Sequence, residues 1–249
     1  MKIKAYVKWY SKGRPYPAAL VAGLKDFDVE IVEDSIGQGS ATTAMRAWAR
    51  GGKADATHIM VFDDDVILAK NFTSSIARAV AARPDHALNF IWIATSGIPG
   101  WKYGRQWDEI FAAAKRQQIA WVDQNVIQFG PTVLLPRALA KDFPEWCAKE
   151  INPSIGQWDD LWMRLFLLSR QRHFTQSVPC PVLHDPAMLS FSGLSPNKFR
   201  QGENFVEDAA TINWDTPSLS FLDNPRLVLW DQRAGLTVGG ETWRTFNLG

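Results

Sequence analysis

Cysteine, excess charge of either sign and long apolar runs are all scarce in this sequence. Its 249 residues include two cysteines, Cys147 and Cys180, which lie far apart and form no Cys-x-x-Cys motif. This spacing indicates neither a zinc motif nor a disulfide framework, and we expect a reducing, cytoplasmic environment. With 27 Lys+Arg against 26 Asp+Glu, the net charge of +1 provides no global basic field for nucleic acid.

Membrane and secretion signals are also lacking. No stretch reaches the ~18 uninterrupted apolar residues that a membrane-spanning helix needs. Residues 1–10 alternate between apolar and polar side chains, which predicts a strand and not the apolar core of a signal peptide. The length and composition are those of one large domain, or of one domain with an elaborated tail.

The most informative segment that is present is a run of three carboxylates, Asp63, Asp64 and Asp65, directly after apolar residues 59–62. The apolar run predicts a short buried strand, which places the carboxylates where the chain meets solvent. Carboxylate oxygens suit Mg²⁺ or Mn²⁺, and such an ion suits the phosphates of a ligand. An acidic triplet can also simply end a strand in a solvated turn.

Strands and helices are expected to alternate along the first part of the chain. The predicted strands are residues 2–10, 29–33, 59–62 and 87–94, and the predicted helices are 16–24, 41–50 and 71–82. We expect Ser40 or Thr42 to cap the second helix and Gly51-Gly52 to end it. This alternation predicts a parallel-rich α/β sheet, whose ligands bind at the carboxyl ends of the strands.

The second part is less regular. We expect a loop at residues 95–104, two strands within 120–135, helices at 137–149 and 159–172, and a strand-like run at 179–183. The tail from Asp185 is loop-rich, with short strands at 218–222 and 226–230. Asp159 and Asp160 open the helix at 159–172, whose leucines share one face. Acidic residues in a first turn can serve only the positive helix N-terminus.

Four segments carry a family resemblance in their order and spacing. They are Val7 to Pro15 with the following strand that ends in Glu33-Asp34-Ser35, then Gly39 to Arg46, then Asp63-Asp64-Asp65, and then Gly156 to Leu165. Together, from about residue 3 to His184, they resemble the GT-A class of nucleotide-sugar-dependent glycosyltransferases, especially its inverting, family-2-like members.

The resemblance implies an α/β fold of the GT-A, Rossmann-like type: a mixed, mostly parallel sheet flanked by helices, with a loop-rich C-terminal extension. It divides the chain into a catalytic domain at 1–184 and an extension at 185–249 packed on the same domain. Within the catalytic domain it implies a nucleotide-sugar half at about 1–94 and an acceptor half at about 95–184.

The resemblance also implies the site. Asp65 would bind Mn²⁺ or Mg²⁺ directly, Asp63 would serve the metal or the ribose, and His184 would be a further metal ligand. Asp160 would be the catalytic base that takes the proton of the acceptor hydroxyl, and Asp159 would hydrogen-bond the acceptor. The remaining expected contacts to the donor, a nucleoside-diphosphate sugar and most simply a UDP-sugar, are Tyr10, Lys12, Arg14, Asp34, Arg46 and Asp64.

Other functions remain open on the sequence. A haloacid-dehalogenase-like phosphatase also has an Asp-x-Asp at a strand end, although that motif usually lies on the first strand of the domain. A nucleotidyltransferase would need a Gly-rich basic loop after the first strand, for which residues 11–15 are a faint match. A nucleotide- or sugar-binding module without catalysis is the alternative that is not an enzyme.

The acceptor is open as well, and a glycan, a small molecule or a hydroxymethylated DNA base would each fit. The aromatic and basic tail would suit nucleic acid, through phosphate contacts and base stacking. The residues concerned are Lys198, Arg200, Arg226, Trp230, Arg233, Trp243 and Arg244.

Overall fold

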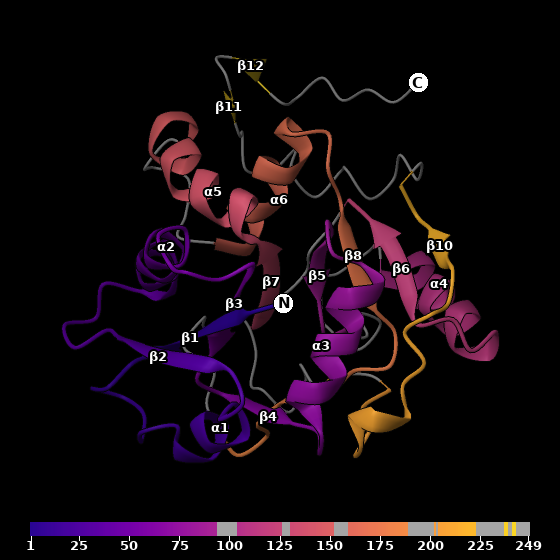
Figure 1. Cartoon of the computed structure of the whole chain (residues 1–249). Coiled ribbons are helices and arrows are strands. Elements are labelled where there is room, and N and C mark those ends of the chain that lie inside the picture. The colour runs from indigo at the N-terminus through magenta and orange to yellow at the C-terminus, as the bar shows by residue number, and fades with distance from the viewer. Residues whose placement is uncertain are drawn as a thin grey trace.

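The computed structural model describes residues 1–93, 104–125, 130–151, 159–188, 202 and 204–222, with short strands at 237–238 and 241–242. The main sheet has eight strands in the order β10-β6-β8-β5-β7-β3-β1-β2 (Figure 1). Their bounds are β1 Ile3–Trp9, β2 Asp28–Glu33, β3 His58–Asp63, β5 Ala87–Asn89, β6 Trp121–Gln124, β7 Thr132–Pro136, β8 Phe174–Ser177 and β10 Ser218–Ser220.

Four of the seven neighbouring pairs in this sheet are parallel. They are β1 with β2, β1 with β3, β5 with β8, and β6 with β10. β7 runs antiparallel to both β3 and β5, and β6 runs antiparallel to β8. The predicted α/β class with a mixed, mostly parallel sheet is therefore confirmed.

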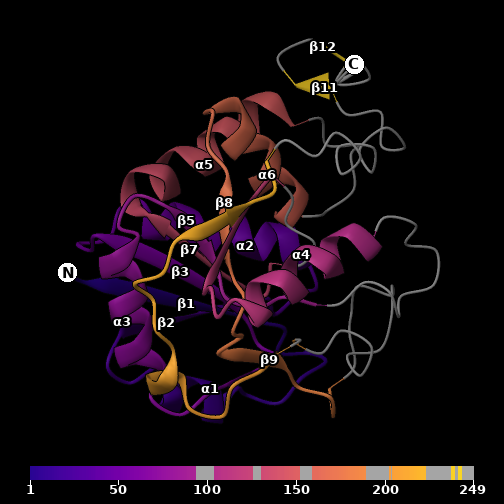
Figure 2. The same cartoon turned by 90° about the vertical axis from the view of Figure 1, so that its right-hand side faces the viewer.

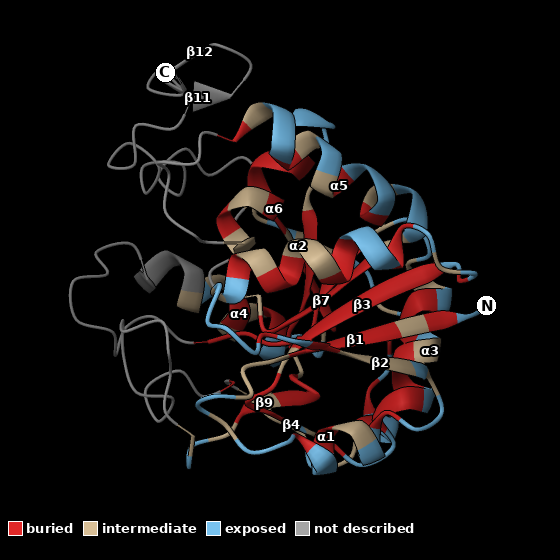
Figure 3. Ribbon diagram, turned by 90° about the vertical axis from the view of Figure 1, so that its left-hand side faces the viewer, coloured by how far each residue is buried: buried red, intermediate tan, exposed pale blue. Residues whose placement is uncertain are grey.

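Two layers cover the sheet (Figure 3). Helices α2 (Ser40–Gly51), α5 (Arg137–Glu150) and α6 (Asp159–Ser169) pack on one face. Helices α1 (Ala18–Gly23) and α3 (Phe72–Ala82) pack on the other, next to a small antiparallel sheet of β4 (Val66–Leu68) and β9 (Val182–His184). Helix α4 (Gly104–Arg116) packs beside β6, and β11 (Thr237–Val238) pairs with β12 (Glu241–Thr242).

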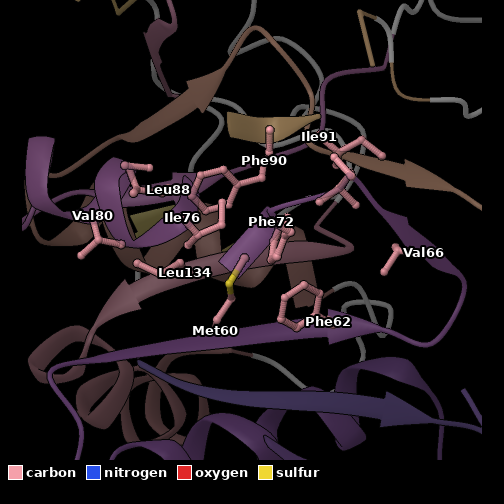
Figure 4. Packing of buried hydrophobic residues seen from close by; sticks show 14 of the residues in the cluster. Met60, Phe62, Val66, Phe72, Ile76, Val80, Leu88, Phe90, Ile91 and Leu134 are labelled. Atoms are coloured by element: carbon pink, nitrogen blue, oxygen red, sulfur yellow. The ribbon is translucent and has the colours of Figure 1, made fainter. Parts of the chain in front are cut away.

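Side-chain alternation along the central strands fixes which layer each residue meets. In β3, Met60 and Phe62 point into the cluster with α3, where Phe72, Ile76 and Val80 pack against them (Figure 4). Ile59 and Val61 point into the cluster with α2, α5 and α6. By the same alternation, Asp63 lies on the face of the sheet that α2, α5 and α6 cover. The same alternation in β1 places Lys8 with Tyr6 on the α2 and α6 side, so one face of the sheet brings both charged residues to its carboxyl edge.

The main departures from the predicted elements have physical causes. The strand predicted at 87–94 ends at Asn89, although residues 90–93 are buried, because apolarity reports burial and not strand pairing. Helix α2 begins at Ser40 after Gly39, and no side chain caps it. β8 was not predicted as a strand, because its residues Thr175, Gln176 and Ser177 are polar although they are buried. Residues 95–103 of the predicted loop at 95–104 and the predicted strand at 226–230 lie outside the described residues, and Gly104 begins α4.

The described part of the C-terminal extension is built into the molecule. Residues 204–222 run past α3 to the edge of the main sheet, where β10 joins β6 (Figure 2). Trp214 packs against Trp121 with ring centroids 4.7 Å apart, and its indole nitrogen donates to Ser75 Oγ at 2.9 Å. None of the helices in the described residues has the length and apolarity that a bilayer crossing requires.

Candidate active site

Lys8 lies at the centre of the acidic residues at the carboxyl edge of the sheet. It is paired in register with Asp63, because β1 and β3 are parallel neighbours. Lys8 Nζ lies 2.6 Å from Asp63 Oδ1 and 2.9 Å from Asp159 Oδ2, and it donates to Ser40 Oγ at 3.0 Å. The first turn of α6 is thereby joined to the end of β3. The two acidic motifs found in the sequence thus meet at one ammonium group.

The charges of Lys8 and its neighbours are closely linked. Burial alone would lower the pKa of Lys8, but the carboxylates of Asp159 and Asp63 raise it above its ordinary value, so Lys8 stays protonated. The pKa of Asp63 is raised by burial and by the nearby Asp65 and Asp159, while Lys8 opposes this effect. Lys8 therefore offsets part of the repulsion within a crowded acidic group.

Arg14 holds the other two carboxylates of the triplet. Its guanidinium contacts Asp64 through Nη1, and its Nη2 lies 3.0 Å from Asp65 Oδ2. Burial would lower the pKa of Arg14, but Asp65 and Asp64 raise it. The chain turns back at this point: the Gly13 and Arg14 amides donate to Tyr10 O, and the Tyr10 amide donates to Asp64 Oδ2 at 3.0 Å. The loop after β1 therefore lies against the acidic triplet.

Asp34 shapes the loop that leads into α2. Its carboxylate accepts backbone hydrogen bonds from Gly37 and Gln38 at 2.8 Å and from Gly39 at 2.9 Å. Burial would raise the pKa of Asp34, and these backbone donors lower it. Gly37 and Gly39 have φ values of 80° and 95°, which suit glycine. The loop ends at Ser40, which reaches Lys8. The predicted donor contact of Asp34 stays a prediction.

Asp160 is a further carboxyl group with a raised pKa at this site. It stands in the first turn of α6, and its Oδ1 accepts from the Leu161 amide at 2.8 Å. Burial, and then the charge of Asp159, raise its pKa to about 7. A carboxyl group of this kind exchanges a proton near neutral pH, which suits a general base. Asp159 beside it is ion-paired with Lys8.

The predicted metal ligands come from neighbouring segments. His184 is buried on β9 opposite Val66 of β4, and the Asp185 amide donates to Asp65 O at 2.8 Å. The carboxylates of Asp63 and Asp65 are donors that suit Mn²⁺ or Mg²⁺, so the residue types fit the ion. In the structure, these two carboxylates contact Lys8 and Arg14. An ion bound at Asp65 would therefore compete with Arg14.

Among the described residues, one group of three His, Cys, Asp or Glu side chains has its ligand atoms within 4.8 Å of one another: His86, Asp123 and His173. Asp63, Asp65 and His184 are not such a group in this conformation, and their metal role stays a prediction.

The other predicted site residues are either exposed or half-buried near this edge of the sheet or lie outside the described residues. Lys12 is exposed in the turn after β1, and Arg46 is half-buried on α2. Residues 152–158, which precede Asp159, and the basic tail residues from Lys198 to Arg200 and from Arg226 onward lie outside the described residues. Sequence reasoning missed Lys8 and Ser40. For Lys8 no local pattern was available, because its place beside Asp63 depends on the pairing of β1 with β3.

No family model matches the sequence, and a search of curated proteins finds no match. Several solved structures have a similar arrangement of elements. A197 from STIV is 9% identical over 74% of this chain and 84% of its own, with a TM-score of 0.44. Mannosyltransferase PcManGT from Pyrobaculum calidifontis, in complex with GDP-Man and Mn2+, is 12% identical over 78% of this chain and 58% of its own, with a TM-score of 0.42.

Mannose-1-phosphate geranyltransferase from Thermus thermophilus is 9% identical over 71% of this chain and 74% of its own, with a TM-score of 0.39. The structures similar to this chain thus include transferases.

Proposed function

We propose that this chain is a nucleotide-sugar-dependent glycosyltransferase of the GT-A type that moves a sugar from a nucleoside diphosphate to an acceptor hydroxyl. One observation carries the proposal: Lys8 joins Asp63 of the acidic triplet to Asp159, beside Asp160, at the carboxyl edge of a mostly parallel sheet. Ligands of such sheets bind at this edge. This arrangement supports the proposal, because Asp63, which we assign to the metal and the diphosphate, lies near Asp160, which we assign as the base.

The donor diphosphate is assigned to the acidic triplet and the loop after β1. Mn²⁺ or Mg²⁺ held by Asp65 and Asp63, with His184 as a further ligand, would neutralise charge on the departing diphosphate. Arg14 now spans Asp64 and Asp65, and its planar fork suits two phosphate oxygens equally well. Tyr10 is assigned to the nucleotide base, and Lys12 and Arg46 to the phosphates.

Asp160 is assigned as the base. The acceptor oxygen attacks the anomeric carbon while its bond to the diphosphate breaks, and the acceptor proton passes to Asp160. A pKa of about 7 leaves a large fraction of Asp160 ionised at neutral pH and still able to accept a proton. A direct displacement of this kind inverts the anomeric configuration. Asp159 is assigned to the acceptor hydroxyl, and Lys8 acts as a positioning residue that holds Asp159 next to Asp63.

The domain division follows from the same assignment. Residues 1–94 supply the donor side with Lys8, Arg14 and Asp63, and residues 95–184 supply the acceptor side with Asp159 and Asp160. Residues 185–249 form an extension on the same domain. Acceptor hydroxyls on a glycan, on a small molecule and on a modified DNA base are the classes to be screened. A salt-dependent gel shift with hydroxymethylated DNA would favour the last class.

A thermal-shift series tests the proposal. The full chain is heated with each nucleoside-diphosphate sugar in Mn²⁺, in Mg²⁺ and in EDTA. One donor is expected to stabilise the protein only when metal is present, by about 2.7 kcal/mol at a concentration of about 100 times its Kd. Asp65→Ala should abolish this shift. Asp55→Ala is the matched control, because its side chain is fully exposed and pairs only at the surface with Lys2.

Two results would count against the proposal. If no nucleotide sugar shifts the melting temperature in any metal, the chain has no donor site of this kind. If Asp65→Ala keeps full donor affinity, the metal and the diphosphate do not bind at the acidic triplet. Hydrolysis of a simple phosphate monoester by the wild-type protein would then favour the phosphatase alternative.

A further inference from the structure

A second polar cluster lies at the opposite edge of the main sheet. His86 directly precedes β5, and His173 directly precedes β8. β5 runs in the same direction as β3, because each is antiparallel to β7 between them. The starts of β5 and β8 therefore lie at the edge where β3 begins, away from Asp63 at its end. Asp123 of β6 reaches the same place, because β6 runs antiparallel to β8 and pairs Asp123 with Thr175.

The geometry of this cluster is that of three converging ligands. One ligand atom from each of His86, Asp123 and His173 lies within 4.8 Å of the others. His173 Nε2 is 3.7 Å from Asp123 Oδ1, and the rings of His86 and His173 are nearly perpendicular with centroids 6.0 Å apart. The His173 and Asp123 side chains are 31% and 18% exposed, so an ion can reach them from solvent.

A fourth side chain orients two of the three. Thr175 Oγ1 donates to Asp123 Oδ1 at 2.6 Å and lies 2.7 Å from His86 Nδ1. Hydrogen bonds of this kind fix the ring orientation and the carboxylate position of metal ligands. The neighbouring cation Arg83 donates to Thr216 O at 2.8 Å and to Ser218 Oγ at 3.3 Å, which directs its guanidinium toward the C-terminal segment.

We propose that His86, Asp123 and His173 form a binding site for a divalent transition-metal ion such as Zn²⁺. Two imidazoles and one carboxylate favour Zn²⁺, Co²⁺ or Ni²⁺ over Mg²⁺ and Ca²⁺, which prefer oxygen ligands. Zinc accepts four ligands at about 2.0–2.2 Å from nitrogen and oxygen, so three protein ligands leave one position for water. The ligand atoms, which lie within 4.8 Å of one another, would have to move closer to reach this geometry.

The bound ion would cross-link three segments of the sheet that are far apart in the sequence. β6 supplies Asp123, the residues directly before β5 and β8 supply the two histidines, and β10 of the C-terminal segment pairs with β6. An ion that binds the folded chain and not the unfolded chain stabilises the fold by mass action. We therefore expect the stability of strands β10, β6, β8 and β5 to depend on the bound metal.

The experiment uses the full chain after chelation and removal of the chelator. Zn²⁺ and Co²⁺ should raise its melting temperature, Mg²⁺ should not do so through this site, and bound Co²⁺ should give the visible absorption of a low-coordinate complex. Two separate variants, His173→Gln and Asp123→Asn, should each weaken Co²⁺ binding by about 10–100-fold or more. A loss of about 10–100-fold is typical when only a hydrogen-bond partner of a metal ligand is changed. His58→Gln is the matched histidine control, because His58 belongs to neither proposed metal site and is hydrogen-bonded to Pro84 O, and it should keep the Co²⁺ spectrum.

The result is independent of the glycosyltransferase proposal. Asp65→Ala should keep the response to Zn²⁺ even where it loses the donor-dependent shift. An unchanged Co²⁺ affinity in both His173→Gln and Asp123→Asn would overturn the metal site. The absence of a Zn²⁺ shift in the wild-type protein would overturn it as well, and His86, Thr175, Asp123 and His173 would then form a hydrogen-bonded network alone.

Discussion

Asp160 makes a pH dependence testable at the level of one residue. Its pKa is raised to about 7 by burial and by Asp159, so it is protonated below that pH and ionised above it. If Asp160 is the base, transfer should rise with pH through about 7. Asp160→Asn should lose about 10²–10⁴-fold in rate and keep donor affinity. Rates measured from pH 5.5 to 8.5, with exposed Asp142→Asn as control, check this.

Stability should change with pH in the opposite direction. Because the folded pKa of Asp160 lies above its unfolded value, the native state binds the extra proton, and stability falls as pH rises from about 4 to about 7. Asp160→Asn removes this ionisation and should be more stable than the wild type above pH 7. For catalysis, normal turnover by Asp160→Asn would show that a group other than Asp160 takes the proton of the acceptor hydroxyl.

Lys8 gives a second prediction at this scale. Its side chain is 7% exposed and sits between Asp63 and Asp159, which are 31% and 22% exposed. Lys8→Met should cost about 2–4 kcal/mol, slightly below the 3–5 of fully buried pairs because the carboxylates keep some water. Urea unfolding measures this. Lys2→Met, at a pair that is 54% and 100% exposed, should cost at most about 1 kcal/mol. Equal losses in the two variants would contradict the role of Lys8.

The acidic residues of the candidate site could be selected from the sequence, and the basic residue that joins two of them could not. Asp63 to Asp65 follow an apolar run, and Asp159-Asp160 open an amphipathic helix, so local pattern was enough. Lys8 has no such pattern, because its importance depends on the pairing of β1 with β3. His86, Asp123 and His173 are separated in the sequence, and strand order alone brings them together.

At the scale of elements, the loop from Asp34 to Gly39 positions the start of α2. Gly37 has φ of +80°, and a Cβ added there would meet the Tyr10 ring only at ordinary contact distance of 3.8 Å. The backbone is therefore the main cost, and Gly37→Ala should lose about 1–2 kcal/mol. Ser35→Ala in the same exposed loop is the control and should change stability by less than about 0.5 kcal/mol. Unfolding in urea compares them, and equal stability of the two variants would show that the loop tolerates a side chain at residue 37.

Elements with clear periodicity were predicted well, and elements with buried polar residues were missed. The helices at 41–50, 71–82 and 137–149 appear as α2, α3 and α5 within a few residues. β8 was missed because Gln176 is buried, with its amide nitrogen donating to Asn89 O and Ile91 O. A strand whose polar groups are satisfied inside the protein has no apolar signature, and only the neighbouring strands reveal it.

At the scale of the whole molecule, the C-terminal segment completes the half of the sheet that lies away from the acidic triplet. The order of strands in this half, β10-β6-β8-β5, brings together chain segments from four distant parts of the sequence. Sequence periodicity could predict the α/β class, but it could not place residues 204–222. Their position depends on non-local contacts such as Trp121 Nε1 donating to Trp214 O at 3.0 Å.

Trp214 provides the test of that organisation. It is buried against Trp121 and Phe90, and its indole donates to Ser75 Oγ. Trp214→Ala should cost about 3–5 kcal/mol, since it leaves a large cavity and removes that hydrogen bond. Half-buried Leu219→Ala, in β10 of the same segment, is the control and should cost less. Both are measured by urea unfolding. If the segment acts only on stability, both variants should bind the nucleotide sugar with wild-type affinity under folding conditions, because the acidic triplet lies at the end of β3 and not in this segment. A selective loss of donor affinity in Trp214→Ala would instead show that the C-terminal segment shapes the site.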